Sequence, residues 1–137
     1  RIYEYVIINR LAPPSIERTR AWHIRKKLDL EMIKKGTKKL FGTYDFSTFR
    51  ASNCYSKSPI RTLKKIKVKR LNEKITIQFK SKSFLRNQVR SMVGCLKYLG
   101  EKKWSLKKFE SVFKSKNRKL CAPPAPAHGL YLLKVNY

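Results

Sequence analysis

Residues 83–100 constrain the fold more than any other stretch, because they combine a strong helical pattern with a terminal glycine. Apolar side chains from Leu85 to Leu99 recur at helical spacing and predict a face that packs in a core. Gly100 stands where such a helix stops. A second face is basic, and basic residues opposite an apolar stripe usually contact solvent; the alternative is an edge that faces something anionic. The residues of this second face are Arg86, Arg90, Gly94 and Lys97.

The charge balance indicates the class of partner. The chain of 137 residues has 34 Lys and Arg against 8 Asp and Glu, a net charge of +26. Such an excess destabilises a compact chain unless a polyanion is usually near, so nucleic acid is the first partner to consider and an anionic membrane surface the second. With 42% hydrophobic residues, the chain is not a disordered basic tail. No apolar run is long enough to span a membrane and no signal peptide opens the chain, so we expect one cytoplasmic domain over residues 1–137.

Metal-ligating residues are few and scattered. Cys54, Cys95 and Cys121 form no CxxC pair, and His23 and His128 lie far apart in the sequence. A zinc site would need ligands from four separate segments, so no metal site is expected and the cysteines are interpreted as reduced structural residues.

Four segments have the composition of strands. Residues 2–8 are rich in β-branched and aromatic residues, and residues 130–135 follow a glycine bend. Residues 65–69 and 74–80 alternate polar and apolar side chains around a turn at 72–73, which predicts an antiparallel hairpin with one buried face. The other face of this hairpin would carry Lys65, Lys67, Lys69, Lys74 and Lys80.

Two further helices begin at recognisable caps. Asp29 is a candidate N-cap for a helix that ends near Leu40, and Ser105 is a candidate N-cap for a helix over residues 106–113. Residues 43–50 are too irregular for a strand or a long helix, so we expect a loop that places its phenylalanines in the core. Residues 18–23 are interpreted as a basic connection.

The order of these elements is strand, helix, strand, strand, helix, extra helix, strand. It predicts an α+β protein with a ferredoxin-like βαββαβ fold, in which helices cover one face of an antiparallel sheet. The open face, with its lysines, could bind RNA. The signature of the RNA-recognition module is absent, and residues 75–79 carry aliphatic side chains where that module needs rings.

Six segments match a known set of motifs in the right order along nearly the whole chain: residues 1–5, 20–23, 45–50, 58–62, 84–94 and 126–132. Together they resemble the tRNA pseudouridine synthase A family. The resemblance implies the carboxy-terminal half of an enzyme that is built from two ferredoxin-like halves and works as a homodimer. It also implies a reaction that isomerises uridine in the anticodon stem-loop of tRNA without a cofactor.

The resemblance implies roles for two residues. Tyr3 would stack on the target uracil and is implicated in proton abstraction, and Arg90 would pair with the catalytic aspartate and keep it ionised. That aspartate belongs to a Gly-Arg-Thr-Asp segment, which this sequence lacks. We therefore expect this chain alone to be inactive. Asp45 is not expected to substitute, because it matches a different motif of the family.

Phosphate contacts are expected from basic residues outside the chemistry, and they predict steep salt dependence of tRNA binding. These candidates are Arg18, Arg20, Arg50, Lys57, Arg61, Arg86, Lys116, Arg118 and Lys119.

A non-catalytic RNA-binding module of the same fold is the alternative. We expect the enzyme and the binding module to differ in the sequence upstream of Arg1, because the chain begins within a strand pattern and not at an initiator methionine. An upstream Gly-Arg-Thr-Asp segment would favour the enzyme, with its amino-terminal half as a partner of this chain.

Overall fold

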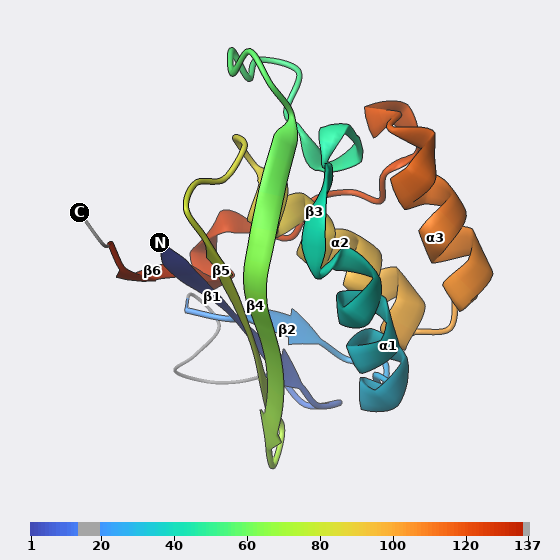
Figure 1. Cartoon of the computed structure of the whole chain (residues 1–137). Coiled ribbons are helices and arrows are strands. Elements are labelled where there is room, and N and C mark those ends of the chain that lie inside the picture. Colours follow the sequence, from blue (N-terminus) through green and yellow to red (C-terminus); the bar gives the residue numbers. More distant parts are fainter. Residues whose placement is uncertain (14–19, 136–137) are drawn as a thin grey trace.

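The computed structural model describes residues 1–13 and 20–135, which form one mixed sheet covered by three helices (Figure 1). The strands are β1 (Ile2–Asn9), β2 (Trp22–Ile24), β3 (Gly42–Asp45), β4 (Ile60–Leu71), β5 (Lys74–Ser81) and β6 (Leu130–Lys134). The helices are α1 (Leu30–Leu40), α2 (Gln88–Gly100) and α3 (Leu106–Ser115), and the short 3-10 turns are η2 (Ser47–Phe49), η3 (Arg118–Leu120) and η4 (Ala127–Gly129).

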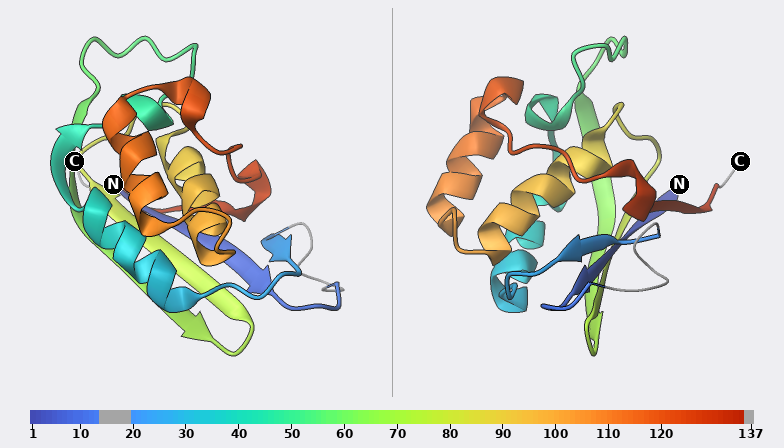
Figure 2. Two further views of the ribbon diagram at one scale, coloured as in Figure 1. Left: turned by 90° about the vertical axis from the view of Figure 1, so that its right-hand side faces the viewer. Right: turned by 180° about the vertical axis from the view of Figure 1, so that it is seen from behind.

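The sheet is centred on β1 and β5. Its order is β2-β1-β5-β4-β3, and β6 also pairs with β1, over the half of β1 that β2 leaves free. All three helices lie on one side of the sheet (Figure 2). Between the two layers lies a core that includes Tyr5, Ile77 and Phe79 of the sheet and Met92 and Leu96 of α2, each 0% exposed. The mixed α+β class, the 72–73 hairpin and the final strand are confirmed.

The pairing of β2 with β1 corrects the expected antiparallel sheet. Trp22 lies beside Ile7 in a parallel register, within residues that the sequence assigns to a connection. Because successive residues of a strand face opposite sides, Val6 and Ile8 point away from the helices, and both pack against Ala21. The second half of β1 is therefore buried on both faces, which agrees with its continuous run of apolar residues.

The helix expected over 83–100 begins five residues later, at Gln88. Asn87 has φ of 63°, a left-handed conformation that ends the preceding turn. Gln88 closes this turn, because its backbone N–H donates to the carbonyl of Leu85 at 3.0 Å and its Oε1 accepts from the N–H of Leu85 at 2.9 Å. As a result Arg86 lies on a turn and not on the helix.

The two predicted N-caps are confirmed. Asp29 Oδ1 accepts from the N–H of Met32 at 3.2 Å, and Ser105 Oγ accepts from the N–H of Lys108 at 3.0 Å.

The aromatic segment 43–50 is partly a strand, because β3 pairs with β4 through its start. The predicted burial of its phenylalanines is confirmed, since Phe46 and Phe49 are 0% and 1% exposed. Asp45 Oδ1 accepts from the N–H of Ser47 at 2.8 Å and so caps the turn after the strand.

Candidate active-site cleft

A cleft of about 230 Å³ brings the two predicted catalytic residues together. One wall is the start of β1, and the other is the turn before α2 with the first turn of that helix. Sequence reasoning assigned no role to Phe84 or Leu130, which also line it; the only signal for them was their position inside two of the motifs. The side chains that carry the argument are Tyr3, Phe84, Arg86, Arg90 and Leu130.

Tyr3 is fixed by the sheet and by one neighbouring ring. Its backbone lies between Phe79 of β5 and Leu132 of β6 in the sheet register. The ring of Phe84 contacts it edge-on, with centroids 5.3 Å apart and an interplanar angle of 82°. Tyr3 is half-buried and lines the cleft, so it presents a held aromatic ring to whatever enters.

Arg90 is held by one residue through two hydrogen bonds. Its Nε donates to the carbonyl of Ala125 at 2.7 Å, and the N–H of Ala125 donates to the carbonyl of Arg90 at 2.9 Å. Within residues 1–13 and 20–135, no carboxylate lies within 4.0 Å of the guanidinium. The arginine is thus oriented, while its charge has no acidic partner in that part of the chain.

The second face of α2 is covered, so the expectation of a solvated edge is wrong for most of it. A Cβ on Gly94 would lie 2.1 Å from the carbonyl oxygen of Pro123, which shows how closely the chain after α3 crosses the helix. Lys97 Nζ lies 3.5 Å from Glu101 Oε1 and 5.1 Å from the centroid of the Trp22 ring. Periodicity could not reveal this, because the covering residues are distant in sequence.

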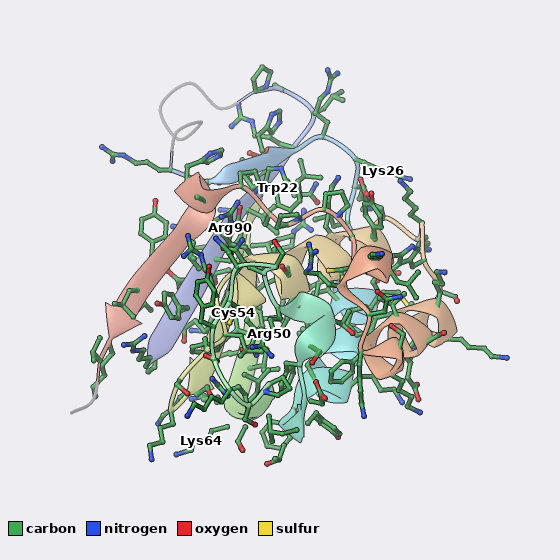
Figure 3. The ribbon with its side chains drawn as sticks, turned by 90° about the horizontal axis from the view of Figure 1, so that it is seen from above. Trp22, Lys26, Arg50, Cys54, Lys64 and Arg90 are labelled. Carbon is green, nitrogen blue, oxygen red and sulfur yellow. The ribbon has the colours of Figure 1, made fainter. Side chains whose placement is uncertain are left out.

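A second hollow, of about 440 Å³, adjoins the cleft and contains three of the predicted phosphate contacts: Arg50, Lys116 and Arg118. Ala51 lines this hollow and Arg86 lines the cleft. The N–H of Ala51 donates to the carbonyl of Arg86 at 3.1 Å and so connects the hollow to the cleft. Figure 3 looks down on this end of the molecule, where Arg90 lies with Arg50 and Cys54.

Two of the predicted phosphate contacts also hold the loop before β4. Arg50 Nη2 donates to the carbonyls of Cys54, at 3.3 Å, and of Ser56. Arg61 Nη1 donates to the carbonyls of Ser58 at 2.7 Å and of Ile60 at 2.8 Å. These arginines therefore have a structural role that their sequence pattern did not indicate.

The remaining candidates are dispersed. Lys57 and Lys119 are exposed, and Arg20 lines a different hollow together with Tyr131 on the helix-free side of the sheet. Arg18 lies outside the described residues.

Cys54 has a distinctive environment at this end of the molecule. Partial burial raises the pKa of its thiol, but the N–H groups of Ser56 and Arg86, the Ser56 hydroxyl and the Arg50 guanidinium outweigh burial and lower the pKa to about 7. The structure therefore distinguishes this thiol from an inert structural cysteine.

Over 1–13 and 20–135, no three His, Cys, Asp or Glu side chains gather as metal binding requires. Over the same ranges, no helix combines the length and apolarity needed to cross a membrane.

The chemistry available in the cleft is limited by its lining. An aromatic ring and a charged guanidinium suit a planar base and an anion. Among the described residues that line the cleft, none has a carboxylate or an imidazole. The cleft thus offers an aromatic surface for a base and a guanidinium that can pair with a carboxylate. Its described lining supplies no carboxylate.

Comparisons with known proteins agree with one another. The family model described as tRNA pseudouridine synthase matches residues 37–137. The tRNA pseudouridine synthase A of Pelagibacter ubique is 66% identical over 137 residues, which are 100% of this chain and 56% of that protein. The proteins of that name from Caulobacter vibrioides and Paramagnetospirillum magneticum are 43% and 46% identical over the same 100% of this chain, covering 56% and 54% of their own length. The chain spans about half the length of the curated relatives it matches.

Proposed function

The chain belongs to the tRNA pseudouridine synthase family, and we propose that it supplies one side of the active site of a synthase that isomerises uridine in the anticodon stem-loop of tRNA. The cleft carries this proposal, because it brings Tyr3 together with an Arg90 that has no carboxylate partner among residues 1–13 and 20–135. The nucleophilic aspartate is proposed to come from the remaining part of the complete synthase.

Tyr3 has two proposed tasks. The target base must leave the tRNA stack, and stacking on an aromatic ring, worth roughly 1–3 kcal/mol, offsets part of that cost. Isomerisation breaks the bond from the sugar to the uracil nitrogen, turns the base and forms a bond from the same sugar carbon to a uracil carbon. That uracil carbon must lose its hydrogen as a proton, and the phenolic oxygen of Tyr3 is proposed to take part in its removal. The uracil nitrogen released from the sugar takes up a proton, so the net reaction moves one proton from carbon to nitrogen.

Arg90 is proposed to set the charge and the direction of the aspartate. A guanidinium beside a carboxyl group lowers its pKa and favours the ionised, nucleophilic form. The Nε of Arg90 is committed to Ala125. Among the described residues neither Nη atom has a hydrogen-bond partner, so both are available to donate to a carboxylate end-on, which orients it.

The placement of the chain within the synthase is a proposal as well. The spatial order β6-β1-β5-β4, with helices on one face, supports a ferredoxin-like half-enzyme. We assign it to the carboxy-terminal half of a cytoplasmic homodimer, as the motifs imply.

The test uses a complete synthase in which this chain replaces the matching residues of the Pelagibacter protein. Pseudouridine in an unmodified tRNA transcript is measured by mass spectrometry. We expect activity that Tyr3→Leu abolishes and that Tyr44→Phe, a change at an exposed tyrosine of β3, leaves intact. A complete protein that binds tRNA tightly and forms no pseudouridine would instead establish the non-catalytic RNA-binding module.

A further inference from the structure

The chain between α3 and β6 includes a proline segment, residues 123–126, that lies against α2 (Figure 2). Prolines occupy 123, 124 and 126, so the segment has a single backbone N–H, that of Ala125. It can be fixed in place only through its carbonyls, this N–H and side-chain packing. Few attachments therefore decide where each of its carbonyls points.

Ala125 uses both of its backbone groups on Arg90. It donates its N–H to the carbonyl of Arg90 at 2.9 Å and accepts from Arg90 Nε at 2.7 Å. Ala125 is 0% exposed, so water does not compete for these bonds. The position of the Ala125 carbonyl consequently sets the direction of the guanidinium in the cleft.

The next carbonyl of the segment is held by a buried tyrosine. Tyr5 of β1 is 0% exposed, and its Oη donates to the carbonyl of Pro126 at 2.5 Å. Gly129 packs directly on the Tyr5 ring, since a Cβ there would lie 2.7 Å from Cζ. Burial raises the pKa of Tyr5, and the nearby positive charge of Arg90 lowers it by less. The phenol therefore stays protonated and can donate its hydrogen bond.

We propose that Tyr5 is a positioning residue for the synthase reaction: by holding the Pro126 carbonyl it fixes the adjacent Ala125 carbonyl, which aims Arg90 at the catalytic aspartate. The inference rests on the proposed function of Arg90. Tyr5 does not line the cleft, so it acts through the proline segment and not on the substrate.

The test is Tyr5→Phe in the complete synthase, which removes one oxygen and keeps the ring against Gly129. We expect kcat to fall about tenfold, the scale of removing one hydrogen bond, with the Kd for tRNA unchanged. Thr48→Val is the matched control, because Thr48 is also 0% exposed and its hydroxyl donates to the carbonyls of Val112 and Phe113, both at 3.0 Å. It removes a buried hydroxyl that bonds to the end of α3 and not to the proline segment, and it should leave kcat intact.

A double-mutant cycle separates positioning from general destabilisation. Arg90→Lys keeps a cation but loses the Nε–H bond to Ala125, so Tyr5→Phe should lower kcat little further in that background. An equal loss of kcat in both backgrounds, or a normal kcat in Tyr5→Phe alone, overturns the positioning role and leaves the proposed function intact. A normal kcat in both Arg90→Lys and Arg90→Ala removes the proposed function of Arg90, and this inference with it.

Discussion

The N–H of Ala51 donates to the carbonyl of Arg86 at 3.1 Å, and this bond connects the cleft to the basic hollow beside it. If a base of a nucleic-acid strand enters the cleft, the phosphates next to that base would lie along the hollow. Arg86 lines the cleft and Arg118 lines the hollow, and both side chains are exposed, so they can contact these phosphates.

Binding of tRNA should therefore weaken steeply with salt. Arg86→Gln and Arg118→Gln should each weaken tRNA binding by the complete synthase and reduce the slope of log K against log salt by roughly 0.7–0.9 for each phosphate that the protein no longer neutralises. Filter binding at several salt concentrations measures this. Lys35→Gln, an exposed change on α1, is the control with the same change in charge. An affinity that hardly varies with salt contradicts the electrostatic account.

The chain by itself should bind RNA but form no pseudouridine, because the described lining of the cleft supplies no carboxylate. Prolonged incubation of the isolated chain with a tRNA transcript, followed by nucleoside analysis, checks this. Asp45→Ala should change nothing catalytic, since its carboxylate caps the N–H of Ser47 at 2.8 Å. Product formed by the isolated chain and abolished in Asp45→Ala would show that Asp45 is the nucleophile.

Cys54 should alkylate with a half-maximal rate near pH 7, because the thiolate is the reactive form and its pKa is lowered to about 7. The rate should rise with pH through that value and fall below it. Iodoacetamide labelling followed by peptide mass spectrometry resolves each cysteine. Arg50→Gln removes one of the groups that stabilise the thiolate and should move the midpoint upward. A midpoint near 8.5, about the ordinary cysteine value, would contradict the described environment.

Gly94→Ala should destabilise the fold, although the same change inside a helix ordinarily stabilises by up to about 1 kcal/mol. Its new Cβ would lie 2.1 Å from the backbone oxygen of Pro123, so we expect a loss of about 1–3 kcal/mol in the free energy of unfolding. Gly36→Ala in α1 is the comparison, since the atoms nearest to its Cβ would be the side-chain ends of Leu99 and Leu96, at 2.5 and 2.9 Å, and not backbone. Urea denaturation ranks the two, and a Gly94→Ala protein as stable as the parent would place the proline segment elsewhere.

Local signals predicted most of the fold. Caps such as Asp29 and Ser105, the alternation in 74–80 and the helical spacing within α2 all depend on neighbours in sequence, and the structure confirms each of them. The late start of α2 escaped notice because it depends on the left-handed backbone of Asn87, which asparagine tolerates but does not require.

Long-range contacts account for what was missed. β2 has only three residues and exists because β1 offers it a parallel edge, which no local pattern announces. The hydrogen bond from Arg90 to Ala125 connects residues that lie 35 positions apart in the sequence. Of the cleft, Tyr3 and Arg90 were found through motif resemblance, and Leu130 was not singled out although it lies in such a motif.

We propose that Arg90 acts on the chemistry of the cleft and not on tRNA binding. This proposal is tested most directly by measuring kcat and the Kd for tRNA of Arg90→Ala in the complete synthase, with Arg86→Ala as the matched arginine in the same cleft. We expect Arg90→Ala to lower kcat by about a hundredfold or more and barely to change Kd, whereas Arg86→Ala should mainly raise Kd. Equal losses of kcat and affinity in Arg90→Ala would place Arg90 among the phosphate contacts and rule out its role in the chemistry.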